Sequence, residues 1–466
     1  MPLPVLSVAQ MREWETATWS LGVSQESVMR RAGAAVAARV CQLTRPGESV
    51  LVLAGRGHNG DDARFAAEGL AERAVRLVNV TDPVAAAAEV RIAPAALVVD
   101  GLLGIGLNRP LDAAWNGLHR TINSRGCPVL AVDVPSGLDA DTGEARGDVL
   151  RATVTVTFGA VKRGLLRTDA VPLIGRLELA HDIGLAPCPF LEADVNWTLA
   201  TDFGGFPPGR CVSGHKGTFG HVVIVAGSLG FHGAAVLAAS GALRAMPGLV
   251  TVLTTDAAFI PVASQISQAM VRPWKAGAAL PASCSAVVFG PGLAGDDVPP
   301  GLREAMTRLW REANLPVVAD ASALDWLPAE RIPSGSTRVI TPHPGEAARL
   351  LGQSVPRVQS DRPAAVRELS RRLGGCHVVL KGHQTLCGAA FGPVIVNPTG
   401  NPGLAQGGTG DVLAGYLGGL LAQPGADASM AMRYAVFQHG RAADELSARG
   451  GAWTVAGLLA RLGGTG

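Results

Sequence analysis

The sequence has no paired cysteine motif. Its seven cysteines are scattered, odd in number and never in a CxxC spacing. A disulfide framework or a zinc site would need more regular spacing, so we expect reduced thiols of the kind found in cytoplasmic proteins. The first residues, MPLPVLSVAQMREWETA, contain no long apolar stretch with a basic flank, and no signal peptide is predicted.

A strong net charge and a long uninterrupted hydrophobic run are also missing. The formal net charge is +2 over 466 residues, which gives no electrostatic argument for binding nucleic acid or an anionic membrane surface. The most apolar long window, residues 234–253, contains Arg244, Pro247 and two glycines. A buried helix followed by a strand explains it better than a membrane span. We therefore expect a soluble, cytoplasmic protein with no membrane or nucleic-acid partner.

Both halves of the chain alternate β-rich runs with helical stretches. This alternation is typical of parallel α/β sheets, and the near-continuous apolar strands suit a sheet that is covered on both faces. The predicted strands are residues 50–54, 75–80, 97–100, 129–134 and 153–158 in the first half, and 221–226, 249–254, 286–289, 317–320, 339–341 and 377–381 in the second. The predicted helices include residues 62–73, 112–123, 411–422 and 428–448.

The length of the chain favours more than one domain. The periodicity fades between residues 187 and 210, and Phe203–Gly209 (FGGFPPG) predicts a loop. The two halves do not look like copies of each other. We therefore predict two different α/β domains, residues 1–205 and residues 206–466.

The strongest candidate site is the segment Asn401–Asp411, which leads directly into a helical pattern. Its glycines at 407, 408 and 410 allow tight turns with outward N–H groups, and the start of the helix adds its positive dipole end. This arrangement predicts a phosphate site. A carboxylate and a phosphate repel each other, so the presence of Asp411 at a phosphate site requires an explanation. One explanation is that Asp411 is the general base for a hydroxyl that attacks phosphorus. The alternative is that Asp411 only caps the helix.

Three other segments place glycines and polar groups at the ends of predicted strands. TPHPGE (341–346) presents His343 and Glu346, LKGHQT (380–385) presents Lys381, and FGPGL (289–293) is a glycine-rich turn. In an open α/β sheet, ligands bind beyond the carboxyl ends of the strands, so these turns together predict one nucleotide pocket. The sequence shows no cluster of metal ligands, and Mg²⁺ would bind mainly through the phosphates.

These motifs, with HKGTFG (215–220), Gly227-Ser228 and Gly233–Ala235, resemble in order those of the ADP-dependent NAD(P)H-hydrate dehydratases. The resemblance covers about residues 210–450 and implies a ribokinase-like fold. It implies that ADP, with Mg²⁺, is the phosphoryl donor and contacts Lys381, Gly382, His383, Gln384, Thr385 and Gly410. It implies that hydrated NADH or NADPH contacts Ala234, Gly292, His343 and Asp411.

The chemistry implied by this resemblance replaces a poor leaving group with a good one. Water added to the nicotinamide ring leaves a hydroxyl, and hydroxide leaves poorly. Phosphorylation by ADP would make phosphate the leaving group, which the ring nitrogen can expel. Asp411 would take the hydroxyl proton, and the glycine N–H groups would stabilise charge on the moving phosphoryl group. One departure from the family is Ser322, which stands where a second acid is usual.

Four segments of the first half form a second set of motifs, SVAQMR (7–12), GRGHNGDD (55–62), VDGLLGIGLNRP (99–110) and AVDVPSGLDADTG (131–143). The second of them follows a predicted strand and opens a helix, as an anion site would. Together they resemble the NAD(P)H-hydrate epimerases over about residues 5–190. This resemblance implies a Rossmann-like domain with a three-layer α/β sheet.

The epimerase resemblance also implies roles for single residues. A potassium ion would bind at Asn59, Asp100 and Ser136, because hard oxygen ligands suit an alkali cation. Asp133 would be catalytic; the alternative for Asp100 and Asp133 is that they only cap turns. Hydrated NAD(P)H would contact Asp133 and the residues of two turns, which are His58, Asn59, Gly60, Asp61, Asp62, Gly104, Ile105, Gly106, Leu107, Asn108, Arg109 and Pro110.

Two positions depart from the epimerase pattern. Residues 58–63 read HNGDDA where the family has NNGGDG, and Arg30 stands where a glutamate is usual. Asp61 adds a carboxylate and a Cβ where glycine is usual. Because like charges repel, we expect Asp61 to weaken the binding of an anionic substrate and hence epimerisation.

These observations predict a bifunctional enzyme, expected to be a homo-oligomer, that acts on a small-molecule substrate. An N-terminal epimerase would interconvert the R and S hydrates of NAD(P)H, and a C-terminal dehydratase would use ADP to restore the S form. Two alternatives remain open. The second half could be a small-molecule kinase on the same fold, which would use ATP and release a stable phosphorylated product. The first half could be a non-catalytic binding or assembly module.

Overall fold

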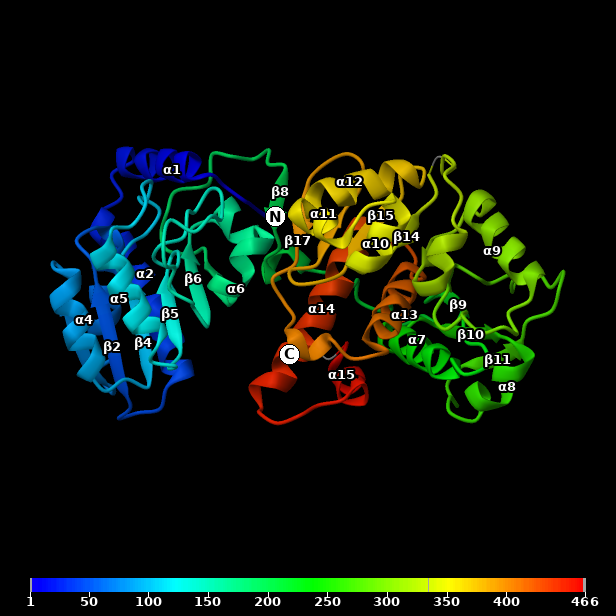
Figure 1. The fold of residues 1–466 in the computed structure, drawn as a ribbon. Coiled ribbons are helices and arrows are strands. Elements are labelled where there is room, and N and C mark those ends of the chain that lie inside the picture. The colour runs from blue at the N-terminus through cyan, green and yellow to red at the C-terminus, as the bar shows by residue number, and fades with distance from the viewer. Residues whose placement is uncertain (1, 334, 464–466) are drawn as a thin grey trace. The chain divides into compact units, whose positions relative to one another are not determined.

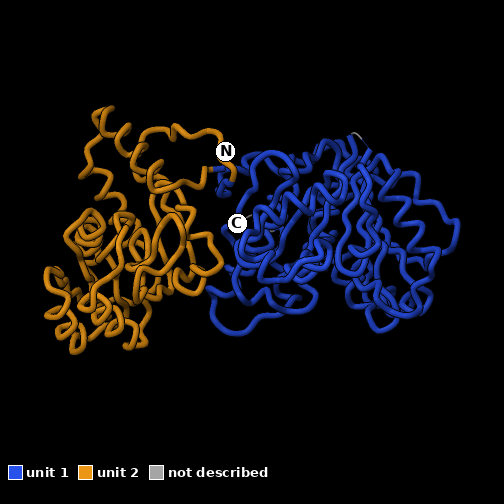
Figure 2. The backbone as a smooth tube through the Cα atoms, turned by 45° about the horizontal axis from the view of Figure 1, so that its top comes forward, with its two compact units in different colours: residues 1–2, 195–466 blue, residues 3–194 orange. Residues whose placement is uncertain are grey.

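The structure is a computed structural model that describes residues 2–333 and 335–463. The chain divides into two compact units, which Figure 2 draws in different colours. We call Leu3–Asp194 the first unit and the part that starts at Val195 the second unit. Each unit is an α/β fold built on a parallel sheet, as the alternation of strands and helices predicts.

In the first unit the strands are β1 (Leu3–Pro4), β2 (Ser49–Ala54), β3 (Ala74–Asn79), β4 (Leu97–Gly101), β5 (Val129–Val132), β6 (Val154–Phe158) and β7 (Arg176–Ala180). The helices are α1 (Val8–Ser20), α2 (Gln25–Leu43), α3 (His58–Glu68), α4 (Pro83–Ile92), α5 (Ala113–Asn123) and α6 (Val171–Ile174). The sheet order is β3-β2-β4-β5-β6-β7, and every neighbouring pair is parallel. The chain order therefore reverses between β2 and β4, which is where ligands bind in folds of this kind.

Alternate residues of the strands face opposite layers of helices. Val50 and Val52 of β2 belong to the core with α2 and α3, whereas Leu51 and Leu53 belong to the core with α4 and α5. All four side chains are fully buried. The apolar run of β2 thus follows from a sheet that is covered on both faces, and the predicted three-layer arrangement is confirmed.

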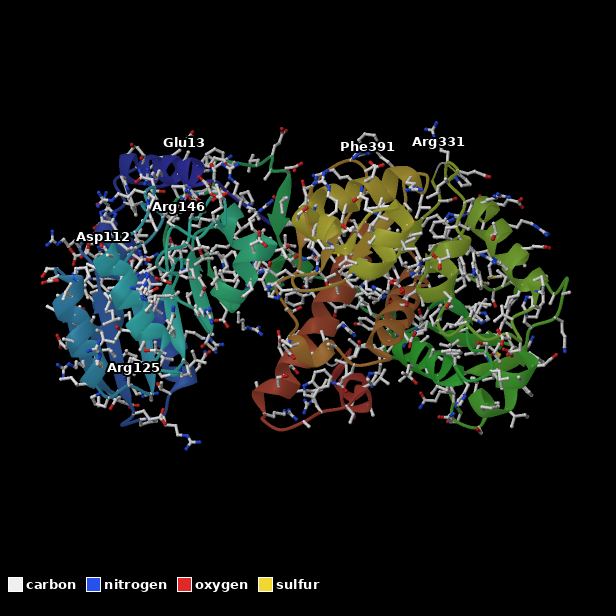
Figure 3. All side chains as sticks on the ribbon, viewed as in Figure 1. Glu13, Asp112, Arg125, Arg146, Arg331 and Phe391 are labelled. Atoms are coloured by element: carbon white, nitrogen blue, oxygen red, sulfur yellow. The ribbon has the colours of Figure 1, made fainter. Side chains whose placement is uncertain are left out.

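Helix boundaries follow local capping. Asp112, labelled in Figure 3, accepts hydrogen bonds from the backbone N–H groups of Ala114 and Trp115 at 3.0 Å and begins α5 where predicted. The helix predicted over residues 62–73 instead spans His58–Glu68, with Gly57 as its N-cap. The turn after β2 is therefore shorter than predicted, and Asn59 and Asp62 lie on the first turns of α3.

In the second unit the strands are β8 (Val195–Trp197), β9 (His221–Val225), β10 (Leu249–Thr254), β11 (Met270–Pro273), β12 (Ala286–Phe289), β13 (Val317–Ala319), β14 (Arg338–Ile340), β15 (His377–Leu380), β16 (Leu386–Gly388) and β17 (Val394–Val396). The helices are α7 (His232–Arg244), α8 (Asp256–Ala263), α9 (Pro300–Glu312), α10 (Pro344–Leu351), α11 (Val355–Ser360), α12 (Arg362–Arg372), α13 (Thr409–Leu421), α14 (Ala428–Ala448) and α15 (Val455–Arg461). Figure 1 labels most of these elements.

The sheet of the second unit also reverses its order once near its middle. The order runs β8-β17-β16-β15-β14-β13-β12-β9-β10-β11, and the strands from β14 through β12 and β9 to β11 are parallel. Helices α7 and α13 pack on one face, where Ala238 and Val412 are fully buried. The opposite face is covered by α9, whose Trp310 meets Phe289 edge-on at 6.4 Å between ring centroids.

The compact units divide at Asp194 and Val195 rather than near residue 205. Strand β8 explains the difference, because Val195, Asn196 and Trp197 pair in parallel with β17. Trp197 is only 2% exposed, so this short strand belongs to the core of the second unit. No helix in the described part of the chain is long and apolar enough to cross a membrane.

This boundary gives a first prediction. A chain that starts at residue 195 should be more stable than one that starts at residue 206. The shorter chain loses the buried Trp197 side chain, which is worth roughly 3–5 kcal/mol. It also loses Asp202, whose Oδ2 lies 2.6 Å from Nη2 of Arg433. Urea unfolding of the two chains measures the difference, and equal stabilities would contradict the placement of β8 in this core.

Candidate active sites

A cavity of about 860 Å³ lies at the carboxyl ends of β2 and β4 in the first unit. This is the reversal point of the sheet. Ten of the residues that the epimerase resemblance implies line the cavity, and these are His58, Asn59, Asp62, Gly104, Ile105, Gly106, Leu107, Asn108, Arg109 and Asp133. Gly60, Asp61 and Pro110 are not among its lining residues. The sequence motifs from three strand ends thus meet at one hollow.

Asp133 follows β5 and is held in an unusual backbone conformation, with φ of 63°. Its Oδ1 atom accepts hydrogen bonds from the Thr157 hydroxyl at 3.0 Å and from the backbone N–H of Phe158 at 3.1 Å. Nζ of Lys162 lies 2.5 Å from the same oxygen, and Lys162 is only 1% exposed. Three donors on one oxygen stabilise the carboxylate. Oδ2 has no hydrogen-bond partner among the described residues, and Asp133 lines the cavity.

Asp62 faces the same cavity from α3. It is 8% exposed, and its buried Oδ1 atom has no hydrogen-bond partner in the part of the chain that the structure describes. Burial raises the pKa of Asp62 to about 8, with repulsion from Asp133, Asp61 and Glu15 adding to it. Burial also raises the pKa of Glu15, another residue that lines the cavity, whereas the charge of Lys162 lowers it.

Two of the residues implied for potassium contact each other, and the third, Asn59, lies beside the turn that follows β4. The Ser136 hydroxyl donates to Oδ1 of Asp100 at 2.6 Å and the Ser136 N–H donates to Oδ2 at 2.8 Å. A Cβ added to Gly104 would lie 3.3 Å from Oδ1 of Asn59. The amide nitrogen of Asn59 is buried without a described partner, and turning that amide would present its oxygen instead. A buried carboxylate, a hydroxyl and an unsatisfied amide fit an alkali cation.

Asp61 does not face the cavity as the sequence led us to expect. Its Oδ1 lies 2.7 Å from Nη1 of Arg64, one turn further along α3, and its side chain is 40% exposed. Arg64 also donates to the carbonyl of Gly55 at 2.6 Å. The negative charge of Asp61 therefore has a partner on the outer side of the turn, which removes the expected reason for weak substrate binding.

In the second unit, Asp411 lies in the first turn of α13 without capping it. The N-cap residue is Gly408, with φ of 96°, and no side chain makes a capping hydrogen bond there. The alternative that Asp411 only caps the helix therefore finds no support. Burial raises the pKa of Asp411 to about 7, and repulsion from Asp320 adds to this while Lys381 opposes it. This carboxyl group can take or give a proton near neutral pH.

Lys381 connects three of the predicted strand ends. Its Nζ atom lies 3.0 Å from Oδ1 of Asp320, which follows β13, and 4.0 Å from Oε2 of Glu346 on α10. Burial disfavours the ammonium form, but Asp320 and Glu346 outweigh it and raise the pKa of Lys381. A Cβ on Gly410 would lie only 3.2 Å from Nζ. The lysine charge thus lies against the glycine-rich start of α13.

Arg362 binds the backbone of the loop from Lys381 to Thr385. The Arg362 guanidinium donates to the carbonyl of His383 and to that of Gln384 at 3.3 Å. Burial lowers the pKa of Arg362 to about 10. Gln384 has a φ of 51°, so the loop keeps a backbone conformation that Arg362 helps to fix. The implied nucleotide residues Lys381, Gly382, His383, Gln384 and Thr385 form this loop.

The remaining implied residues fall into two places. His343 is the N-cap of α10, where its Nδ1 accepts from the N–H of Gly345 at 3.0 Å and its own N–H donates to Glu346 at 2.7 Å. Gly292 has a φ of 63°, and a Cβ there would lie 2.8 Å from Cβ of Ala234. Ala234 and Gly292 are therefore neighbours at the reversal point of this sheet, between β9 and β12.

Comparison with known proteins decides the family. A family profile described as NAD(P)H-hydrate dehydratase matches residues 222–462, and one described as YjeF-related protein N-terminus matches residues 25–90 and 77–164. The bifunctional NAD(P)H-hydrate repair enzyme of Coxiella burnetii is 36% identical over 95% of this chain and 94% of its own length. The Escherichia coli enzyme of that name is 36% identical over 92% of this chain and 87% of its own. The chain belongs to the bifunctional NAD(P)H-hydrate repair enzymes.

A solved structure is also similar to the second half of this repair-enzyme chain. It is the ADP/ATP-dependent NAD(P)H-hydrate dehydratase from Bacillus subtilis, co-crystallised with ATP/Mg²⁺, which is 33% identical with a TM-score of 0.49. The match covers 55% of this chain and 92% of that one.

Three charged residues at the sites of this repair-enzyme chain are not identified by the sequence motifs. They are Glu15 and Lys162 in the first unit and Arg362 in the second. Lys162 comes four residues after the last residue of β6. A basic residue so close to a strand end could have indicated a site residue, because ligands bind beyond the carboxyl ends of strands. Glu15 and Arg362 look like surface charges on helices, and only the tertiary contacts place them at the sites.

The charges around Asp411 give a second prediction. In the full chain with labelled aspartate carboxyls, Asp411 should titrate near pH 7 by carbon NMR, assigned by the signal that Asp411→Asn removes. Asp320→Asn should lower this pKa, because it removes the repulsion and leaves Lys381 without its partner. Lys381→Met should raise it. As a control, Asp427→Asn, at the exposed N-cap of α14, should move nothing. An Asp411 pKa that does not change in Asp320→Asn would contradict this arrangement of charges.

Proposed function

We propose that this chain repairs hydrated NADH and NADPH in two steps. The first unit interconverts the R and S hydrates, and the second unit dehydrates the S form at the expense of ADP. Family membership across both halves supports the two activities and does not favour a small-molecule kinase with a non-catalytic first domain. The observation that carries the proposal most directly is Asp411, a half-buried acid that does not cap its helix, beside Lys381 and a glycine-rich helix start.

In the second unit, Asp411 is the base that takes the proton from the ring hydroxyl as the hydroxyl attacks the terminal phosphorus of ADP and AMP leaves. Lys381, beside Gly410, and the N–H groups at the start of α13 stabilise the moving phosphoryl group. The ring nitrogen then expels phosphate, and loss of a proton from the neighbouring ring carbon to solvent restores the reduced nicotinamide. The proton can move at neutral pH because the pKa of Asp411 is about 7.

The nucleotide lies along the loop from Lys381 to Thr385 in this proposal. Arg362 keeps the loop in shape, and Gly410 lets the phosphates approach the lysine. The described residues contain no group of three or more His, Cys, Asp or Glu side chains able to hold a metal ion. Mg²⁺ would therefore be held by the nucleotide phosphates, and it would offset their charge.

In the first unit, hydrated NAD(P)H occupies the cavity beside β2 and β4. Asp133 faces its reacting ring, and the turn 104–110 forms one wall. A potassium ion held by Asn59, Asp100 and Ser136 would offset the phosphate charge of the substrate. The expected cytoplasmic location and homo-oligomeric state remain predictions of the sequence.

The third prediction tests the base of the second unit. Asp411→Asn keeps the size of the side chain and removes the base, so dehydration of the S hydrate should fall roughly 10²–10⁴-fold. Affinity for ADP should stay the same or rise slightly, because a nearby negative charge is lost. Recovery of reduced-ring absorbance measures the rate, and ADP binding is measured separately. Asp427→Asn serves as the matched control and should keep full activity; near-normal turnover by Asp411→Asn would refute the proposed base.

The fourth prediction concerns Asp61. Because its carboxylate is paired with Arg64, Asp61→Gly should change the Michaelis constant for the R hydrate less than twofold at both low and high salt. Stability should fall by roughly 1 kcal/mol, since glycine is a poor helix residue. R-to-S conversion without nucleotide isolates the first unit. A clear gain in affinity at low salt, where repulsion is least screened, would show that Asp61 faces the substrate after all.

A further inference from the structure

The cavity of the first unit contains more acid than binding requires. Asp62, Asp133 and Glu15 line it beside four basic residues, Arg12, Arg56, Arg109 and Lys162. The basic residues can hold an anionic dinucleotide, whereas three carboxyl groups would repel it. Their number points to proton transfer, and their different surroundings separate the roles.

Asp133 and Asp62 differ in the partners that the fold gives them. Oδ1 of Asp133 accepts from Lys162, Thr157 and Phe158, so the charged form is stabilised. Asp62 is equally buried, yet its Oδ1 atom has no partner among the described residues. A buried carboxyl without donors is stable only as the neutral acid, which has a proton to give. Two carboxyls in one cavity with opposite protonation states are the usual basis of acid–base pairs.

We propose that Asp62, as the neutral acid, protonates the leaving hydroxyl of hydrated NAD(P)H, and that the Asp133 carboxylate, positioned by Lys162, takes the proton of the water that replaces it. This inference rests on the proposed epimerase function. It adds the identity of the acid and the route of inversion.

The step balances as follows. The Asp62 proton goes to the hydroxyl on the ring carbon beside the ring nitrogen. The carbon–oxygen bond breaks, its electron pair leaves with the departing water, and the nitrogen lone pair forms a carbon–nitrogen double bond. Water adds to the opposite face of that carbon, the double-bond pair returns to nitrogen, and the surplus proton goes to Asp133. Exchange with solvent water returns a proton to Asp62, and in the reverse direction Asp133 is the acid.

The charges that face Asp62 fix the sign of the pH dependence. They are Asp133 beyond β5, Glu15 on α1, Asp61 on α3 and Lys162 beyond β6, and with burial they give a pKa of about 8. Epimerisation should therefore decline as the pH rises through about 8, because Asp62 loses its proton. Lys162 lowers this pKa, so Lys162→Met should move the decline to higher pH. A lysine that only stabilises the fold would not change the pH at which epimerisation declines.

The fifth prediction uses the full chain without nucleotide, so that only R-to-S conversion is followed. Asp62→Asn should lower the turnover number roughly 10²–10⁴-fold with little change in the Michaelis constant. Glu68→Gln, at the exposed end of the same helix and paired with Arg30, is the matched control and should keep wild-type turnover. In ¹⁸O-labelled water, each inversion by the wild type should place one labelled oxygen in the product hydroxyl.

Thermal unfolding separates loss of catalysis from loss of fold. A folded pKa raised from 3.8 to about 8 means that Asp62 stabilises the fold at low pH and that this stability is lost as the pH rises towards 8. Asp62→Asn should therefore lose less stability than the wild type between pH 5 and 9. Wild-type turnover by Asp62→Asn, or inversion without label, would overturn the inference and leave the epimerase function standing. A wild type that never interconverts the hydrates would overturn both.

Discussion

Each unit pairs one lysine with the aspartate that follows a parallel strand, and the chemistry of both sites depends on that pair. Lys162 meets Asp133 after β5, and Lys381 meets Asp320 after β13. An ammonium group out of water is tolerated only with such a partner. In each unit a second aspartate, Asp62 or Asp411, lies near this pair on the first turns of a helix. Burial and repulsion from the paired aspartate raise the pKa to about 8 for Asp62 and to about 7 for Asp411, while the lysine opposes the shift.

The two sheets create this arrangement in the same way. Parallel strands end at one edge of a sheet, so residues distant in sequence meet there, and the reversal of strand order leaves room for a ligand. Glycine-rich turns then let the following helix approach closely. In the second unit Gly410 leaves space for the Lys381 ammonium, and in the first unit a Cβ on Gly60 would lie 2.1 Å from the carbonyl oxygen of Gly55. The same geometry therefore supports two different reactions.

Sequence patterns predict most of the parallel strands, the two α/β folds and the glycine-rich turns, because these depend on local patterns. They miss β7 and β11 at the sheet edges and the short strands β16 and β17. Asp411 and Lys381 are also found from local sequence, since Asp411 lies at a glycine-rich helix start and Lys381 at a glycine-containing strand end. Residues fixed by distant contacts are harder to find. Strand β8 is assigned to the second unit only through its pairing with β17, and Arg362 reads as an ordinary helix charge. The Asp61–Arg64 ion pair was not foreseen although the two residues stand at helical spacing, because the predicted helix began too late to include both.

The central claim is that one chain restores both hydrates of the reduced cofactor. The direct measurement gives the full chain an equal mixture of R and S hydrated NADH with ADP and follows the absorbance of the reduced ring. The observation time is kept short against interconversion in a protein-free control. The account predicts recovery of the whole mixture. Recovery that stops at half would contradict an active epimerase in the first unit, and no recovery would contradict the dehydratase as well.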